Sequence, residues 1–380
     1  MITHDVALFA GGLSAKLATR SRHVCAFLGA GTSKACGLPD VATLQSRILS
    51  RLEGSQLIAF KRITSTRNLE QALTRLRRIQ AVVEVDDVVD GLNGAQAIDL
   101  DASICRIIID ELTNVKADLE PVGRLAAWVA RADYAKPVEL FTVNYDTLLE
   151  QALESQGVPY FDGFIGTLKA RFRTDMVEAT SDDSDVWLPS FYARLWKLHG
   201  SVNWTWDTDA SISQVLRLGS VIPAGALAAI FPSDAKYEES RRMPFVVLQD
   251  RMRRALNEPE TLFLVSGYAW ADEHLNELIF DAVARRPRSE VVAFCFAEIP
   301  PSLAEKALTA PNLQVITQQE AIIGGIRAPW SGPEKETTLP ADIWENNRCN
   351  LGDFAALTTF LARSSSGPAL VHSGGVSIEN

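Results

Sequence analysis

Four short, largely apolar runs place the strongest constraint on the fold of this 380-residue chain. They cover residues 23–28, 138–143, 261–266 and 291–296. Each run has the length of a strand but lacks regular polar alternation, which is typical of a strand covered on both faces in a parallel sheet. Amphipathic segments lie between them, as at residues 41–52 and 272–284. The sequence therefore predicts an α/β fold, with helices on both faces of a doubly wound parallel sheet.

The chain is long enough for two domains, or for one large domain that carries an insertion. Residues 55–135 are poor in β-branched runs and place apolar residues at helical spacing, as at Leu69 and Leu73. This stretch is predicted to be a helical insertion. A Ser- and Gly-rich end has the composition of a flexible tail. We expect one α/β domain from residues 1–54 and 136–362, the insertion at 55–135, and the tail at 363–380.

Charge limits the partners that the surface can bind. Lys and Arg number 37 against 47 for Asp and Glu, giving a net charge of −10, which argues against a chain whose whole surface binds nucleic acid. Local basic clusters occur at residues 75–78, at 251–254 and at 285–288. A solvated helix face is the simpler interpretation of each cluster, and a nucleic acid or an acidic partner is the alternative.

The five cysteines are scattered and form no C-x-x-C pair. This spacing fits neither a disulfide framework nor a Cys-rich zinc site, so we expect no metal. A reducing cytoplasm is the expected location, because the first 20 residues do not resemble a signal peptide and no apolar run is long enough for a membrane span.

Polar residues follow three of the strand-like segments. Gly29-Ala30-Gly31-Thr32-Ser33 comes after the first run, Asn144 and Asp146 come after the second, and His199 follows a short apolar segment. Open parallel sheets bind ligands outside the carboxyl ends of their strands, so these residues are candidates for one site. Glycines there permit close approach of a phosphate, and a histidine at such a junction can act as a general base. The alternatives are a tight turn at the glycines, a helix cap at Asp146, and a structural role for His199.

These segments together resemble the sirtuin-like, or SIR2-like, NAD-consuming domains. Residues 29–33 with Gly37-Leu38-Pro39-Asp40 resemble the family's GAGxS and GIPD elements. Residues 142–146 are similar to its T-x-N-x-D element, and residues 197–201 resemble the segment that holds the catalytic histidine. Ser266-Gly267-Tyr268, with Asp272 and Glu273 beyond it, resembles the late loop that contacts the cofactor. The resemblance covers residues 23 to about 300 and implies a Rossmann-like fold of the sirtuin type.

Several positions depart from the deacylating sirtuins. Val41 and Ala42 replace the Phe and Arg that follow GIPD, Val143 replaces Gln, and Ala269 replaces Ser. The paired cysteines of the zinc module are missing. With its helical insertion, the chain looks like the bacterial SIR2-like proteins of anti-phage defence, which hydrolyse NAD to ADP-ribose and nicotinamide. The resemblance thus implies an NAD hydrolase that uses NAD as substrate and needs no metal.

The resemblance also implies a role for each site residue. Cleavage of the nicotinamide–ribose bond creates an oxocarbenium-like centre, which needs a fixed polar group and a base. The catalytic candidates are Asn144 near the ribose carbon, His199 as the base, and Asp146 orienting His199 or the ribose. The NAD-binding candidates are Gly29, Ala30, Gly31, Thr32 and Ser33 at the pyrophosphate, Asp40 near the nicotinamide, and Gly267, Tyr268 and Asp272 in the late loop.

Two other functions stay open at this stage: a zinc-free protein deacylase, and a non-catalytic module that binds NAD or ADP-ribose. Constant hydrolysis of NAD would be toxic, so the family resemblance implies control by a homo-oligomer or by a separately encoded partner. Such partners include HerA-type ATPases and Argonaute-type proteins.

Overall fold

The computed structural model describes residues 2–83, 87–113, 116–179, 193–207, 214–219, 228–230, 244–333 and 338–364. Most of the predicted flexible tail, residues 365–380, lies outside this part of the chain. Within the described residues, every helix is too short or too polar to cross a membrane.

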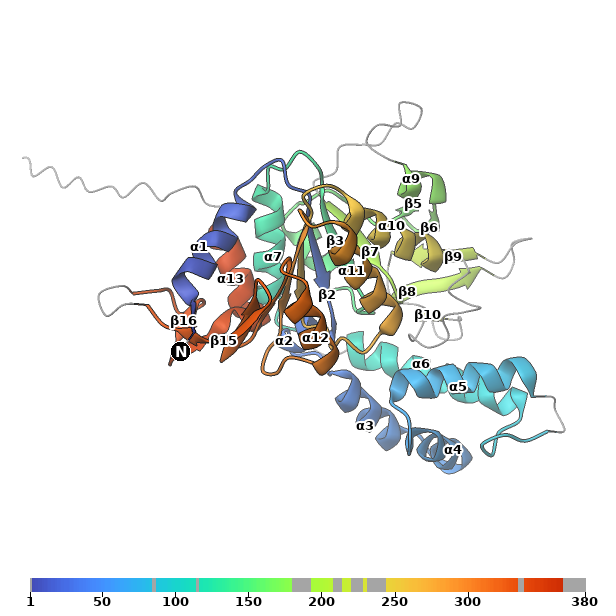
Figure 1. The fold of residues 1–380 in the computed structure, drawn as a ribbon. Coiled ribbons are helices and arrows are strands. Elements are labelled where there is room, and N and C mark those ends of the chain that lie inside the picture. The colour runs from blue at the N-terminus through green and yellow to red at the C-terminus, as the bar shows by residue number, and fades with distance from the viewer. Residues whose placement is uncertain are drawn as a thin grey trace, which may run out of the picture.

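A mostly parallel sheet forms the centre of the molecule (Figure 1). Its strands follow the order β1 (His4–Asp5), β15 (Ile326–Ser331), β14 (Glu320–Ile323), β13 (Leu313–Ile316), β12 (Glu290–Phe294), β11 (Leu262–Ser266), β2 (Val24–Leu28), β3 (Val138–Thr142), β7 (Ala193–Lys197) and β4 (Tyr160–Phe161). Only β14 pairs antiparallel with its neighbours among these strands. The four apolar runs form β2, β3, β11 and β12, which confirms the predicted parallel sheet.

Helices cover both faces of the sheet, as predicted. Side chains of β2 alternate between the two faces: Val24 and Ala26 join one core cluster, whereas Cys25 and Phe27 join the other. The first cluster includes α1 (Val6–Leu17), α7 (Glu120–Arg131), α8 (Leu148–Ser155) and α13 (Phe354–Ser364). The second includes α10 (Phe245–Asn257), α11 (Glu273–Arg285) and α12 (Pro301–Thr309).

The strand order reverses beside β2. The chain passes from β2 to β3 and β7 on one side, and then returns to place β11 and β12 on the other side. These strands run parallel, so the segments that follow them all lie at one edge of the sheet. A crevice at such a reversal is where open α/β sheets bind ligands.

A group of four helices has a hydrophobic cluster of its own (Figure 1). It consists of α3 (Val41–Arg51), α4 (Gly54–Thr64), α5 (Leu69–Val82) and α6 (Gly94–Thr113). The apolar side chains of Leu69 and Leu73 are buried in this cluster. In contrast, α7 packs against α13 and α8 at the sheet. The limits 55 and 135 stay a prediction, because packing relates α3 to the helical group and α7 to the sheet.

The glycine-rich segment is itself helical, because the short α2 (Ala30–Ala35) begins within it. Five short strands between residues 164 and 230, in the parts that the structure describes, form a second, antiparallel sheet. Its order is β10 (Ala228–Ile230), β8 (Gly200–Asp207), β9 (Gln214–Leu218), β6 (Lys169–Phe172) and β5 (Phe164–Ile165). The remaining short elements are α9 (Thr174–Glu178), β16 (Trp344–Glu345), β17 (Arg348–Cys349) and the 3-10 helix η2 (Asn350–Gly352).

Candidate active site

A cavity of about 760 Å³ opens at the carboxyl edge of the sheet, beside the strand reversal. This volume lies within the range of roughly 300–1,000 Å³ that small-molecule sites occupy. Its lining comes from the segments after β2, β3, β7, β11 and β12, together with α3, the start of α5 and the start of α13. The sequence-predicted residues on its wall are Ala30, Gly31, Asp40, His199, Gly267, Tyr268 and Asp272.

Two glycine loops meet backbone to backbone at this cavity. The Gly29 amide donates to Ser266 O at 3.0 Å, and the Gly31 amide donates to Gly267 O at 2.8 Å. A Cβ on Gly29 would lie 2.5 Å from Gly267 O, and one on Gly31 would lie 2.7 Å from Gly267 Cα. Gly267 itself has a φ of +65°. The glycines are thus required by contact between the loops after β2 and β11.

This contact changes what the glycine segment offers to a phosphate. The Gly31 amide is engaged by Gly267, and the Thr32 amide donates to Gly29 O at 2.9 Å. Gly29, Thr32 and Ser33 do not belong to the cavity lining, whereas Ala30 and Gly31 do. The phosphate contacts of these five residues therefore stay a prediction. Lys34, in the same helix, is the cation that this segment presents to the cavity.

Asn144 and Asp146 form side-chain hydrogen bonds with the glycine segment. The Asn144 side-chain amide donates to Gly29 O at 3.0 Å, and to Ser33 Oγ at 2.8 Å. The Ser33 hydroxyl donates to Asp146 Oδ2 at 2.6 Å, and Asp146 Oδ1 accepts from the Leu148 amide at 3.1 Å. Asp146 thus accepts from the first residue of α8, but the N-cap residue is Thr147, so the cap considered for Asp146 lies one position further along the chain. Neither residue lines the cavity, and their catalytic roles stay predictions.

His199 is a buried residue on the cavity wall. It follows β7, and its side chain is 6% exposed. Its Nε2 lies 3.4 Å from Oδ2 of Asp272, and within the described residues its Nδ1 has no hydrogen-bond partner. Buried polar atoms are almost always partnered in folded proteins, so an unpaired imidazole nitrogen in a cavity indicates a place for a ligand or water. The structure therefore brings the predicted base and a carboxylate together at the cavity.

Asp272 is the carboxylate beside His199, the position expected for Asp146 from the family resemblance. Its Oδ1 accepts from the amides of His274 at 3.1 Å and Leu275 at 3.2 Å, which caps α11. The preceding loop is held by Asn276, whose side chain donates to Trp270 O at 2.9 Å and accepts from the Tyr268 hydroxyl at 3.0 Å. The cap and the loop contacts fix the carboxylate before any ligand arrives.

The helical group supplies another wall of the cavity. Val41 and Ala42 of α3 and Asn68 before α5 line it beside Asp40. Hydrogen bonds from Lys34 and Thr43 hold the pKa of the Asp40 carboxyl well below its usual value, so Asp40 remains ionised. Val41, Ala42 and Asn68 were not predicted as wall residues, because no pattern in the sequence indicates that the helical group folds back onto the sheet edge.

Apolar residues from the opposite side complete the lining. Cys295 is buried, and burial raises the pKa of its thiol to about 12, so it stays protonated. Phe296 is 61% exposed at the cavity, and Phe354 of α13 joins it. In the described part of the chain, no group of three His, Cys, Asp or Glu residues could hold a metal ion.

Comparison with known proteins agrees with this architecture. Residues 138–316 match the family model of the SIR2-like domain, a stretch that runs from β3 to β13. This match supports a SIR2-like assignment for residues 138–316. β2 lies outside the matched residues but pairs with β3 and β11 inside them, so the glycine segment follows a strand of the same sheet. No curated protein matches the chain. A SIR2-like domain implies NAD binding and supports an NAD-related function.

Proposed function

We propose that this protein is an NAD⁺ glycohydrolase that releases nicotinamide and ADP-ribose. The observation that carries the proposal is the buried His199, which lines the cavity at the strand reversal with Asp272 next to its Nε2. The SIR2-like match supplies the class of substrate. The reaction adds water across the bond between ribose C1′ and the nicotinamide nitrogen.

The pair of His199 and Asp272 suits a general base. A carboxylate beside one ring nitrogen favours the proton on that nitrogen and leaves the other as an acceptor. Here Asp272 is near Nε2, so Nδ1 is the atom that takes a proton from water or from a ribose hydroxyl. The 3.4 Å separation is longer than an ordinary hydrogen bond, as is common for catalytic pairs without a bound ligand.

The other wall residues fit a dinucleotide in distinct ways. The lining of Ala30, Ala42 and Phe296 offers apolar surface to the rings, while Lys34 offers charge to a phosphate. Lys34 also binds Asp40 at 2.7 Å, so a phosphate there would compete with that carboxylate. Asn144 acts through the glycine segment: its hydrogen bonds to Gly29 and Ser33 hold the cavity wall in place.

Release of nicotinamide by the full chain tests the proposal. The purified protein is incubated with NAD alone, without an acylated peptide, and nicotinamide is followed by chromatography. We expect His199→Ala to lower turnover by about 10²–10⁴, the usual contribution of a general base. Asp272→Asn should lower turnover and shift its pH profile, because the amide no longer favours the required tautomer. His274→Ala is the matched control, since this exposed histidine lies at the start of α11, the helix that Asp272 caps.

The same assay separates the competing functions. A deacylase would release nicotinamide only with an acylated peptide, and a non-catalytic module would bind NAD without turnover. Equal turnover of wild type, His199→Ala and His274→Ala would refute the proposed base. Asn144→Ala is a weaker test, because it removes three hydrogen bonds that the Asn144 side-chain amide donates to the glycine segment, and so lowers stability together with activity.

The proposed role of this activity is anti-phage defence by NAD depletion, and it rests on the family resemblance alone. The same holds for control by a homo-oligomer or by a HerA-type or Argonaute-type partner. Measuring turnover of the chain alone against turnover with each partner, at matched concentrations, tests these assignments.

A further inference from the structure

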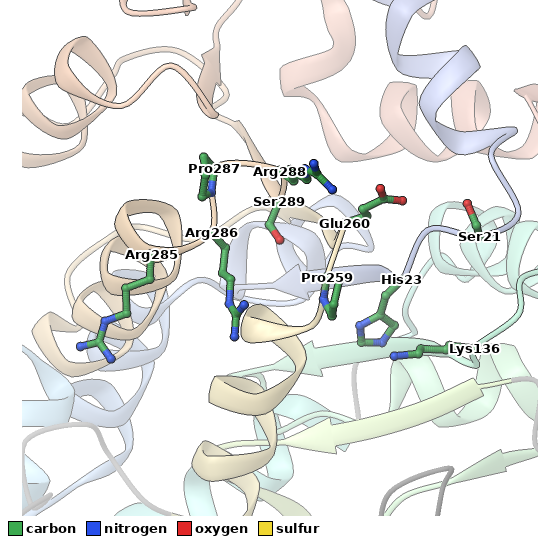
Figure 2. Close-up of a pocket in the computed structure, with 10 residues that line it drawn as sticks. All are labelled: Ser21, His23, Lys136, Pro259, Glu260, Arg285, Arg286, Pro287, Arg288 and Ser289. Atoms are coloured by element: carbon green, nitrogen blue, oxygen red, sulfur yellow. The ribbon is translucent and has the colours of Figure 1, made fainter.

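A second hollow lies at the opposite edge of the sheet. It has a volume of about 490 Å³ and is lined by Ser21, His23, Lys136, Pro259, Glu260, Arg285, Arg286, Pro287, Arg288 and Ser289 (Figure 2). These residues precede β2, β3, β11 and β12, whereas the candidate active site follows the same strands. The two sites therefore lie at opposite ends of these strands.

The lining is basic in a chain whose net charge is −10. Two of its cations already have acidic partners: Lys136 binds Glu258 at 2.5 Å, and Arg285 binds Asp281 at 2.8 Å. Arg286 and Arg288 form no ion pair with any residue that the structure describes. One carboxylate, Glu260, shares the lining with them. The hollow thus has a surplus of positive charge that its own side chains do not neutralise.

The turn that carries the two arginines is fixed. The Asn312 side-chain amide donates to Val283 O at 3.0 Å, to Arg286 O at 3.2 Å and to Ser289 O at 3.0 Å. The Ser289 amide closes the turn onto Arg286 O at 2.9 Å, and its hydroxyl donates to Glu258 O at 3.2 Å. A fixed turn lowers the entropy cost of binding, because only the arginine side chains need to be ordered.

We propose that this hollow binds a phosphorylated small molecule of about nucleotide size. Guanidinium groups bind phosphate oxygens through paired, charge-assisted hydrogen bonds, and Arg286 and Arg288 are available for them. The volume exceeds what one phosphate needs and lies within the range of roughly 300–1,000 Å³ for ligand sites. Concavity favours a small ligand over a nucleic acid, whose backbone needs an extended basic track.

Calorimetric titration with inorganic pyrophosphate tests the site in the full chain at one fixed salt concentration. We expect saturable binding by the wild type and binding weaker by about tenfold or more in the double variant Arg286→Ala/Arg288→Ala. The matched control is Arg253→Ala/Arg254→Ala, which removes two exposed arginines of α10 and should bind as the wild type does. Lys34→Ala tests the candidate active site, whose lining also carries a cation.

Each other outcome overturns the proposal. Absence of wild-type binding, or equal weakening in both arginine pairs, would reduce the effect to general surface charge. Weakening by Lys34→Ala alone would place pyrophosphate in the candidate active site. A single-stranded DNA oligonucleotide that binds more tightly with length, and loses binding in Arg286→Ala/Arg288→Ala, would identify a nucleic-acid surface instead.

Discussion

A buried carboxylate near the start of β3, on the side of the sheet away from the candidate active site, gives the sharpest prediction about stability. Glu139 of β3 is 1% exposed and accepts hydrogen bonds from three other elements. The Nε and Nη2 groups of Arg251 in α10 both donate to the Glu139 carboxylate, Nε at 2.8 Å. Trp196 of β7 donates its Nε1–H at 2.6 Å, and Nε2 of His23, before β2, lies 3.0 Å from Oε1. The substitution Glu139→Gln keeps the shape but removes the charge and turns one acceptor into a donor.

The expected cost follows from these contacts. Burial raises the pKa of Glu139, but the charge of Arg251 and the hydrogen bonds from His23 and Arg251 outweigh it, so the pKa lies below its usual value. Removing one partner of a buried pair leaves the other charge uncompensated, which costs about 3–5 kcal/mol. In the wild type, this stabilisation is complete above the unfolded-state pKa and is lost as the pH falls towards the lowered folded-state pKa.

Urea unfolding measures this cost against a matched control. Glu320→Gln removes a carboxylate from a two-bonded arginine pair with Arg327, but this pair is exposed, with 31% and 48% of the side chains accessible. Exposed pairs contribute about 0–1 kcal/mol. We expect Glu139→Gln to lower the free energy of unfolding at pH 7 by about 3–5 kcal/mol, and this difference from wild type to shrink in acid. Equal effects of the two substitutions would refute the argument.

Two further predictions concern the loops and one buried acid. Gly267→Ala should destabilise the protein by at least about 1 kcal/mol more than Gly37→Ala. Both positions have positive φ, but only the Cβ at 267 would meet another atom closely, Thr32 N at 2.5 Å. Urea unfolding of the two variants measures the difference, and equal losses would contradict the prediction. Burial raises the pKa of Asp162 to about 6, against the lowering effect of Arg217. Its contribution to stability therefore falls as the pH rises through that pKa. Asp162→Asn should gain stability relative to wild type between about pH 4 and pH 7. A difference in the free energy of unfolding between the two proteins that does not change with pH would contradict this prediction.

The strands of the central sheet were predictable because burial on both faces leaves a local mark in the sequence. β2, β3, β11 and β12 are each nearly continuous apolar runs. The antiparallel sheet leaves no such mark. Its strand β6 reads Lys-Ala-Arg-Phe, and it gains its pairing from β9, a segment far away along the chain. Sequence patterns report burial, and they do not report which distant strand completes a pair.

The candidate site was predictable in place but not in detail. Strand ends identified His199 and the glycine segment, since polar residues there stand out after apolar runs. The partner of His199 was not predicted, because Asp272 reaches it from the start of α11, far along the chain, and Asp146 is held by Ser33. The sequence also cannot show which neighbour requires a glycine. The glycines at 29 and 31 were predicted to allow the approach of a phosphate, whereas in the structure Gly267 packs against them.

The contacts of Glu139 decide how loss of activity in a variant should be interpreted. Trp196, which donates to Glu139, lies in β7 three positions before His199, and Glu139 itself lies in β3 ahead of Asn144. Glu139 therefore connects β3 to β7 through Trp196 and to α10 through Arg251, so Glu139→Gln should lower stability and turnover together. His199 makes no such contacts: within the described residues its nearest charged partner is Asp272, at 3.4 Å. A substitution there should cost about 0.5–3 kcal/mol of the free energy of unfolding, and it should reduce turnover even in protein that is fully folded. The base assignment therefore requires turnover and unfolding to be measured on the same protein samples, because a loss of turnover in fully folded protein separates a chemical role from a structural one.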